Sequence, residues 1–237
     1  MATAYGSTND CNVRNTSASS WAGARGTVST TGQLFNSTQT QFDFSIYNVY
    51  TAARGGTATY TCIRSYFPFN LALESGTVTS AVLKLYQKNS GTQADDEATV
   101  KIFEATALAG GNVDYGNCYS SGTTLGTHFA TVDASIGSSF GYVSYTFNSA
   151  GITAINNATG AGGVTVAALG YYDWNNSAPS LGGNYVKIFS FYSEKGGTTV
   201  DPKLTLTFGY DKSVAGSDDP VKVIGIATSD IEKVIGV

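Results

Sequence analysis

Charged side chains are scarce in this chain of 237 residues, of which Asp, Glu, Lys and Arg make up 13%. That share is about half of the one found in ordinary soluble proteins. The net charge of −4 provides no basic surface, so nucleic acid is not expected as a partner. The sequence also contains no apolar run of membrane-spanning length, and a membrane is not expected as a partner either.

A secretory signal is not expected either. The residues Met1–Tyr5 supply neither the basic region nor the apolar region of such a signal. The polar, weakly charged composition is nevertheless that of an extracellular protein. Virion components, which are made in the host cytoplasm and released by lysis, combine these two properties, and so does a recombinant fragment. We therefore expect a location on the surface of a virion.

Histidine occurs once, as His128, and cysteine three times. A Ser-His-Asp triad would depend on His128, but the sequence lacks the G-x-S-x-G nucleophile motif, and no pair of a general acid and a general base stands out. The three cysteines leave at least one unpaired and do not have the spacing of a metal site. Cys62 is expected to be a small buried residue within a strand. We expect a protein that is not an enzyme.

Two strands, at residues 62–71 and 77–86, dominate the pattern of the chain. Side chains alternate between the two faces of a strand, so residues of one parity share a face. Each segment has one apolar face, formed by Ile63, Ser65, Phe67 and Phe69 in the first and by Ala81, Leu83 and Leu85 in the second. Each strand is therefore expected to bury one of its faces.

Further strands are expected at residues 4–13, 26–29, 40–47, 99–105, 127–133, 140–147, 164–171, 185–194 and 203–210. A single short helix is expected at residues 148–156, capped by Asn148 or Ser149, with Ile152 and Ile155 one turn apart on one face. This pattern predicts an all-β fold, a two-sheet antiparallel β-sandwich that is jelly-roll-like.

The two dominant strands also carry a family resemblance. Arg64-Ser65-Tyr66-Phe67-x-Phe69 and Val78-Thr79-Ser80-Ala81-x-Leu83-x-Leu85-Tyr86 resemble the core of the DNRLRE-type β-sandwich modules. Residues 191–194 and 202–206 fall where that family has its last two strands, so the resemblance covers roughly residues 5–210. It implies a short helical crossover near residue 150, and it implies polysaccharide binding, to which some of these modules are linked.

The composition changes after residue 210, which divides the chain into a sandwich domain at 1–210, a linker at 211–220 and an apolar tail at 221–237. The tail repeats itself, since Lys222–Ile226 reads K-V-I-G-I and Lys233–Val237 reads K-V-I-G-V. Such an apolar segment needs a surface to cover it, and it resembles the ends of phage structural proteins. The residues expected to make assembly contacts are Val223, Ile224, Ile226, Ile231, Val234, Ile235 and Val237.

Two kinds of ligand site are suggested by clusters of side chains. Sugar rings stack on aromatic faces, and the aromatic residues grouped in two loops are Tyr171, Tyr172 and Trp174, with Tyr115 and Tyr119.

The acidic residues Asp95, Asp96 and Glu97 are candidate ligands for Ca²⁺, but adjacent carboxylates alone do not supply the roughly 6–8 ligands of such a site. A solvated loop tip is the favoured interpretation, so no cofactor is expected.

Arg64 and Glu194 both lie on expected strands within the family-like motifs. A half-buried charge needs a partner of the opposite sign. We therefore predict that the two side chains form a structural ion pair.

Two function hypotheses follow. The first is a non-enzymatic structural protein of a virion, such as a capsid decoration, tail or fibre component, which binds other virion proteins and copies of itself through its termini. The alternative is a carbohydrate-binding module or a protein that adheres to host glycans.

Overall fold

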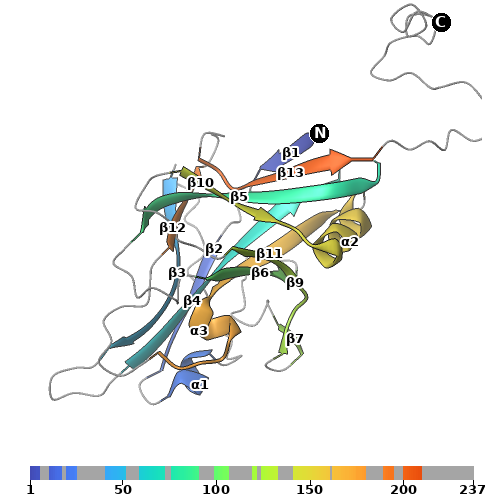
Figure 1. Cartoon of the computed structure of the whole chain (residues 1–237). Helices are drawn as coiled ribbons and strands as arrows, with labels where there is room; N and C mark the ends of the chain where they lie inside the picture. Colours follow the sequence, from blue (N-terminus) through green and yellow to red (C-terminus); the bar gives the residue numbers. More distant parts are fainter. Residues whose placement is uncertain are drawn as a thin grey trace, which may run out of the picture.

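The computed structural model of the chain consists mainly of β-strands, all paired antiparallel (Figure 1). It describes residues 1–5, 11–17, 20–25, 41–51, 59–72, 76–90, 99–106, 119–121, 124–132, 141–160, 162–179, 189–194 and 200–209. The expected strand at 26–29 and the segments 211–220 and 221–237 lie outside these residues.

The strands form two sheets, A and B, which share one strand. Sheet A contains β1 (Ala2–Tyr5), β13 (Lys203–Phe208), β5 (Val78–Ser90), β10 (Gly141–Thr146) and β12 (Phe189–Glu194). Sheet B contains β2 (Cys11–Ser17), β4 (Thr59–Asn70), β11 (Gly163–Gly170), β6 (Val100–Ala105) and β9 (His128–Val132). A separate hairpin joins β7 (Tyr119–Ser121) to β8 (Thr124–Leu125).

Strand β3 (Gln41–Thr51) connects the two sheets. Its residues 41–46 pair with β12 of sheet A, and its residues 47–51 pair with β4 of sheet B. A strand that passes from one sheet to the other in this way forms a corner of a sandwich.

The main core lies between the sheets, because inward residues of both sheets form one buried cluster. Its members include Leu83 and Leu85 of β5, Leu204 and Leu206 of β13, Tyr145 of β10, Phe67 and Phe69 of β4, Val166 and Ala168 of β11, and Val100 and Ile102 of β6. The predicted inward parity of β5 is confirmed, since Ala81, Leu83 and Leu85 are all buried. The chain is therefore an antiparallel β-sandwich, while the jelly-roll order stays a prediction.

The expected helix is present as α2 (Ser149–Ala158). Its N-cap is Asn148, whose side-chain oxygen accepts a hydrogen bond from the Gly151 N–H over 3.0 Å, and Ile155 is buried in the main core. The Asn156 side chain bonds to both the N–H and the carbonyl of Val78, over 2.7 and 3.0 Å. These bonds hold α2 at the start of β5.

The expectation of a single helix is wrong. The structure also contains α1 (Trp21–Arg25) and α3 (Tyr171–Trp174), and both pack on the outer face of sheet B. Such short helices give almost no periodic signal, because they span little more than one turn. Tertiary packing, and not the local sequence pattern, stabilises them.

These helices bury a second face of β4, which corrects the expectation of one buried face per strand. Phe67 and Phe69 point to the main core, while Cys62 and Tyr66 point to the outer side of sheet B. There they join a second cluster with residues of α1 and α3. Arg64 has the same parity as Cys62 and Tyr66, and it is fully buried on this side.

Candidate functional site

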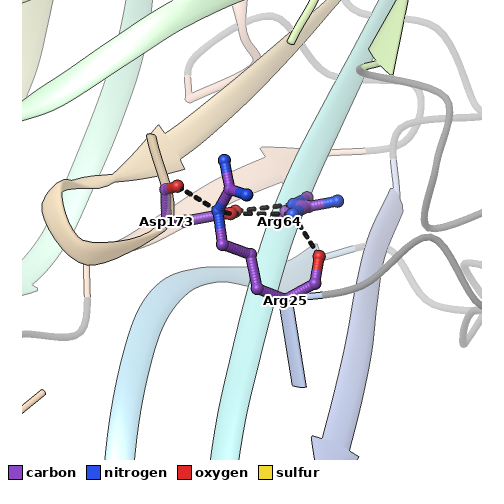
Figure 2. A network of polar contacts seen from close by, with 3 residues as sticks. All are labelled: Arg25, Arg64 and Asp173. Atoms are coloured by element: carbon purple, nitrogen blue, oxygen red, sulfur yellow. Dashed lines mark hydrogen bonds and ion pairs between the residues drawn. The ribbon is translucent and has the colours of Figure 1, made fainter. Parts of the chain in front are cut away.

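Arg25, Arg64 and Asp173 form a buried arginine–aspartate cluster on the outer side of sheet B (Figure 2). Arg64 donates from Nε to Asp173 Oδ2 over 2.6 Å and from Nη2 to Oδ1 over 2.7 Å. Arg25 Nε donates to the backbone oxygen of Asp173 over 2.6 Å and lies 3.3 Å from Oδ1. Arg64 Nη2 also donates to the Arg25 carbonyl over 3.1 Å. The cluster thus ties together α1, β4 and α3, which are distant in sequence.

Burial makes these contacts strong. The side chains of Arg64 and Asp173 are 0% and 1% exposed, and that of Arg25 is 9% exposed. A two-pronged contact between a guanidinium and a carboxylate is both stronger and more directional than a contact between neutral groups. Removing one member would leave its partners charged and desolvated. The geometry supports a structural role, in which the cluster fastens both short helices to the sheet.

The local sequence explains how Asp173 reaches this position. The apolar strand β11 ends at Gly170, and the chain then makes the single turn of α3, with Asn175 N–H bonded to the Tyr171 carbonyl over 3.0 Å. Asn176 follows with a φ of 52°, a left-handed conformation that asparagine tolerates better than most residues. This turn directs Tyr172 and Asp173 inward, where both are buried.

Tyr171 and Trp174 lie on the half-buried side of α3. Their rings are nearly perpendicular, at 82°, with centroids 5.2 Å apart. The indole N–H of Trp174 donates to the Thr99 carbonyl over 3.3 Å, and the Lys101 ammonium lies 3.5 Å from the centre of the indole ring. The two rings are held firmly, but they do not form one flat stacking surface.

The predicted aromatic platform is therefore brought together only in part. Tyr172 is 5% exposed and belongs to the second core cluster, so its ring is not available for stacking. Tyr119 lies in β7, with its side chain outside the described part of the structure, and Tyr115 lies outside it altogether. Sugar binding by Tyr171 and Trp174 stays a prediction.

The other predicted sites have different outcomes. The candidate calcium ligands at residues 95–97 and the assembly residues of the tail lie outside the described residues. So does the side chain of Glu194, and its pairing with Arg64 stays a prediction. The carboxylate that the structure places on Arg64 is that of Asp173. The sequence does not reveal this contact, because its pattern places residues 171–174 in a loop. It does show that Arg64 needs a carboxylate as partner.

His128 lies beside Phe103, with ring centroids 5.5 Å apart. Its Nε2 is 2.7 Å from the Thr131 hydroxyl oxygen. Burial, and after it the charge of Lys101, lowers the pKa of His128 below its ordinary value, although a backbone hydrogen bond with Ala130 partly opposes the shift. The contact with Thr131 joins two residues of the same strand, β9, and supports a structural role for His128.

A pH dependence of stability follows from this shift. Because the pKa of His128 is lower in the folded chain, the unfolded chain binds the proton more readily, and acid favours unfolding. The free energy of unfolding should fall as the pH is lowered from about 7.5 to about 5.5, the range in which an ordinary histidine titrates. The chain has no second histidine, so His128→Gln should flatten this slope in denaturant titrations. An unchanged slope in the variant would refute the assignment.

Comparison with known protein families and with curated proteins finds no match for this chain. Among the described residues, no three side chains of His, Cys, Asp or Glu come together as a metal site. None of the helices described here has the length and apolar character needed to span a membrane.

Proposed function

We propose that this chain is a non-enzymatic structural protein of a virion, such as a capsid decoration, tail or fibre component. In this proposal a sandwich of jelly-roll-like order, akin to the DNRLRE-type modules, is the rigid body. The segment 221–237 docks on neighbouring subunits and buries its apolar residues there.

The observation that carries the proposal is the position of the two ends of the sandwich. Strand β1 pairs antiparallel with β13, with Ala2 opposite Leu206. By the same register, the N-terminus lies next to the end of β13, where the chain leaves the sheet (Figure 1). The segment that follows Gly209 therefore starts at the same corner as strand β1, so both can engage one neighbour.

The rigidity of the body supports the proposal as well. One core fills the space between the sheets, and the arginine–aspartate cluster closes the outer side of sheet B. Such a rigid body suits a subunit of a particle, because little conformational freedom is lost when it assembles.

Removal of the tail tests the proposal. A chain that ends at Pro220 should keep the β-sheet circular dichroism and the unfolding transition of the full chain, because the described core lies within residues 1–209. Sedimentation velocity at tens of micromolar should show oligomers for the full chain and monomers for the shortened one. The matched control keeps the length but replaces Val223, Ile224, Val234 and Ile235 by serine, and it should also be monomeric. Oligomers of equal size in all three proteins would contradict the docking role.

Adhesion to host glycans is a second candidate function. It is favoured by the half-buried rings of Tyr171 and Trp174, which their contacts with each other, Thr99 and Lys101 hold in place. Preorganised aromatic side chains lose little entropy when a ligand stacks on them.

A further inference from the structure

The two sheets differ in how their outer faces are covered. The short helices α1 and α3 lie on the outer side of sheet B. Helix α2 lies at the start of β5, where Asn156 bonds to Val78. No helix in the described part of the chain covers the outer face of sheet A across β1, β13, β5 and β10 (Figure 1).

The side chains of these four strands on this outer face are hydroxyl, tyrosine and lysine groups with one valine, and the carboxylate of Asp201 lies close enough for its charge to act on Tyr142. They alternate with the inward core residues and are Thr3 and Tyr5 of β1, Lys203, Thr205 and Thr207 of β13, Ser80, Val82, Lys84 and Tyr86 of β5, and Tyr142, Ser144 and Thr146 of β10. The two lysines are the charged groups among these side chains, although the whole chain has a net charge of −4.

Its positive charge is concentrated in a lysine pair, Lys84 and Lys203, which lie directly opposite each other on β5 and β13. Like charges in directly opposed positions destabilise a sheet. The ion pairs between described residues are those of Asp173 with the two arginines, and neither lysine takes part in one. Such an unfavourable arrangement is expected where a ligand supplies the missing charge.

Aromatic rings fix part of the lysine pair. The Lys203 ammonium lies 4.5 Å from the ring centre of Tyr142 and 5.7 Å from that of Tyr5. Tyr142 packs edge-on against Tyr86, with centroids 5.2 Å apart, and its hydroxyl donates to the Asp201 carbonyl over 3.0 Å. The face thus presents two cations beside aromatic rings. One of these rings belongs to Tyr5, which is 42% exposed.

The chain itself contains a segment of matching chemistry. Residues 218–226 read D-D-P-V-K-V-I-G-I, in which two adjacent carboxylates precede an apolar stretch. This segment begins nine residues after Gly209, where the chain leaves the face at the end of β13. Nine extended residues span at most about 30 Å, so the segment starts close to its own corner and can extend to an adjoining molecule.

We propose that the outer face of sheet A binds the segment 218–226 of a neighbouring copy of this chain. The carboxylates of Asp218 and Asp219 lie at the lysine pair, and the apolar residues that follow cover the tyrosine rings and Val82. This inference rests on the proposed docking role of the tail and adds the surface that receives it. Opposite charges at the two surfaces steer association and fix its register.

The variant Lys84→Glu tests the receiving surface. It neutralises the face and places a carboxylate opposite Lys203, so the variant should melt no lower than the wild type. Its dissociation constant for self-association, from sedimentation equilibrium, should rise at least about tenfold. The control Lys101→Glu makes the same change of charge on sheet B and should leave self-association unchanged.

Complementation tests whether the contact joins two molecules. Lys84→Glu/Lys203→Glu and Asp218→Lys/Asp219→Lys should each be monomeric alone and should assemble when mixed, because each face then meets a tail of opposite charge. If the full chain assembles and the chain ending at Pro220 does not, but Lys84→Glu assembles normally, the receiving face is wrong and the docking role survives. Mixed variants that stay monomeric, or wild-type assembly that 0.5 M salt leaves unchanged, would also overturn the inference. So would an acidic oligosaccharide that binds the lysine pair tightly while the tail stays docked, because the tail would then occupy another surface.

Discussion

Replacing Asp173 by alanine should lower the free energy of unfolding by about 3–5 kcal/mol, the range measured when one partner of a buried ion pair is removed. The carboxylate accepts two hydrogen bonds from Arg64 and lies 3.3 Å from Arg25 Nε. Without it, the guanidinium groups of Arg25 and Arg64 lose their carboxylate partner while their side chains stay almost fully buried. Chemical denaturation followed by circular dichroism provides the measurement.

The matched control for this substitution is Asn175→Ala, which changes an exposed residue two positions further along the same turn. It should alter the free energy of unfolding by no more than about 0.5 kcal/mol. The variant Arg64→Met/Asp173→Leu should recover part of the loss, because it removes two of the three charges and leaves Arg25 its bond to the backbone carbonyl of residue 173. A loss of less than about 1 kcal/mol for Asp173→Ala would show that the arginine–aspartate cluster does not hold the helices on sheet B.

Gly163→Ala should be the second strongly destabilising substitution, with a loss of about 1–3 kcal/mol or more. Gly163 lies at the start of β11 opposite Asn70 of β4. A Cβ atom at this position would overlap the Phe69 carbonyl oxygen and approach the Phe69 carbonyl carbon to 3.3 Å. Since these atoms belong to the backbone, no change of rotamer relieves the overlap, and the two strands must separate.

The neighbouring glycine provides the control. A Cβ atom at Gly162 would meet no atom within 4 Å, so Gly162→Ala should leave the free energy of unfolding within about 0.5 kcal/mol of the wild type. The thermal unfolding of both variants, measured side by side, tests the register between β4 and β11. Equal melting temperatures for the two alanine variants would contradict that register.

Much of the sandwich could be predicted because alternation of side chains is a local property. The expected segments 99–105, 127–133 and 140–147 correspond to β6, β9 and β10 to within about two residues at each end. The N-cap at Asn148 could also be predicted from the sequence, since asparagine before a short apolar repeat is a common start of a helix.

The arginine–aspartate cluster could not be predicted, because it depends on contacts between segments 109 and 148 residues apart in sequence. The burial of Arg64 depends on α1 and α3, and neither helix has a periodic pattern long enough to recognise. The aromatic residues of α3 were noticed as a group, but only the structure divides them into an inward Tyr172 and the half-buried rings of Tyr171 and Trp174.

The lysine pair shows the same division between local and long-range information. Lys84 follows from the parity of β5 as an outward residue. Its position opposite Lys203 depends on the pairing of β5 with β13, two strands that are more than 100 residues apart in the sequence. Sequence alone gives the charges, but the register of the sheet places them side by side.

The central claim is that the segment 221–237 is covered by another molecule in the assembled protein. Hydrogen–deuterium exchange of the full chain, measured on separated monomer and oligomer fractions, tests it most directly. We predict that the amides of Lys222–Ile226 and Lys233–Val237 are protected in the oligomer and exchange faster in the monomer. Equal exchange of these amides in both fractions would contradict the claim.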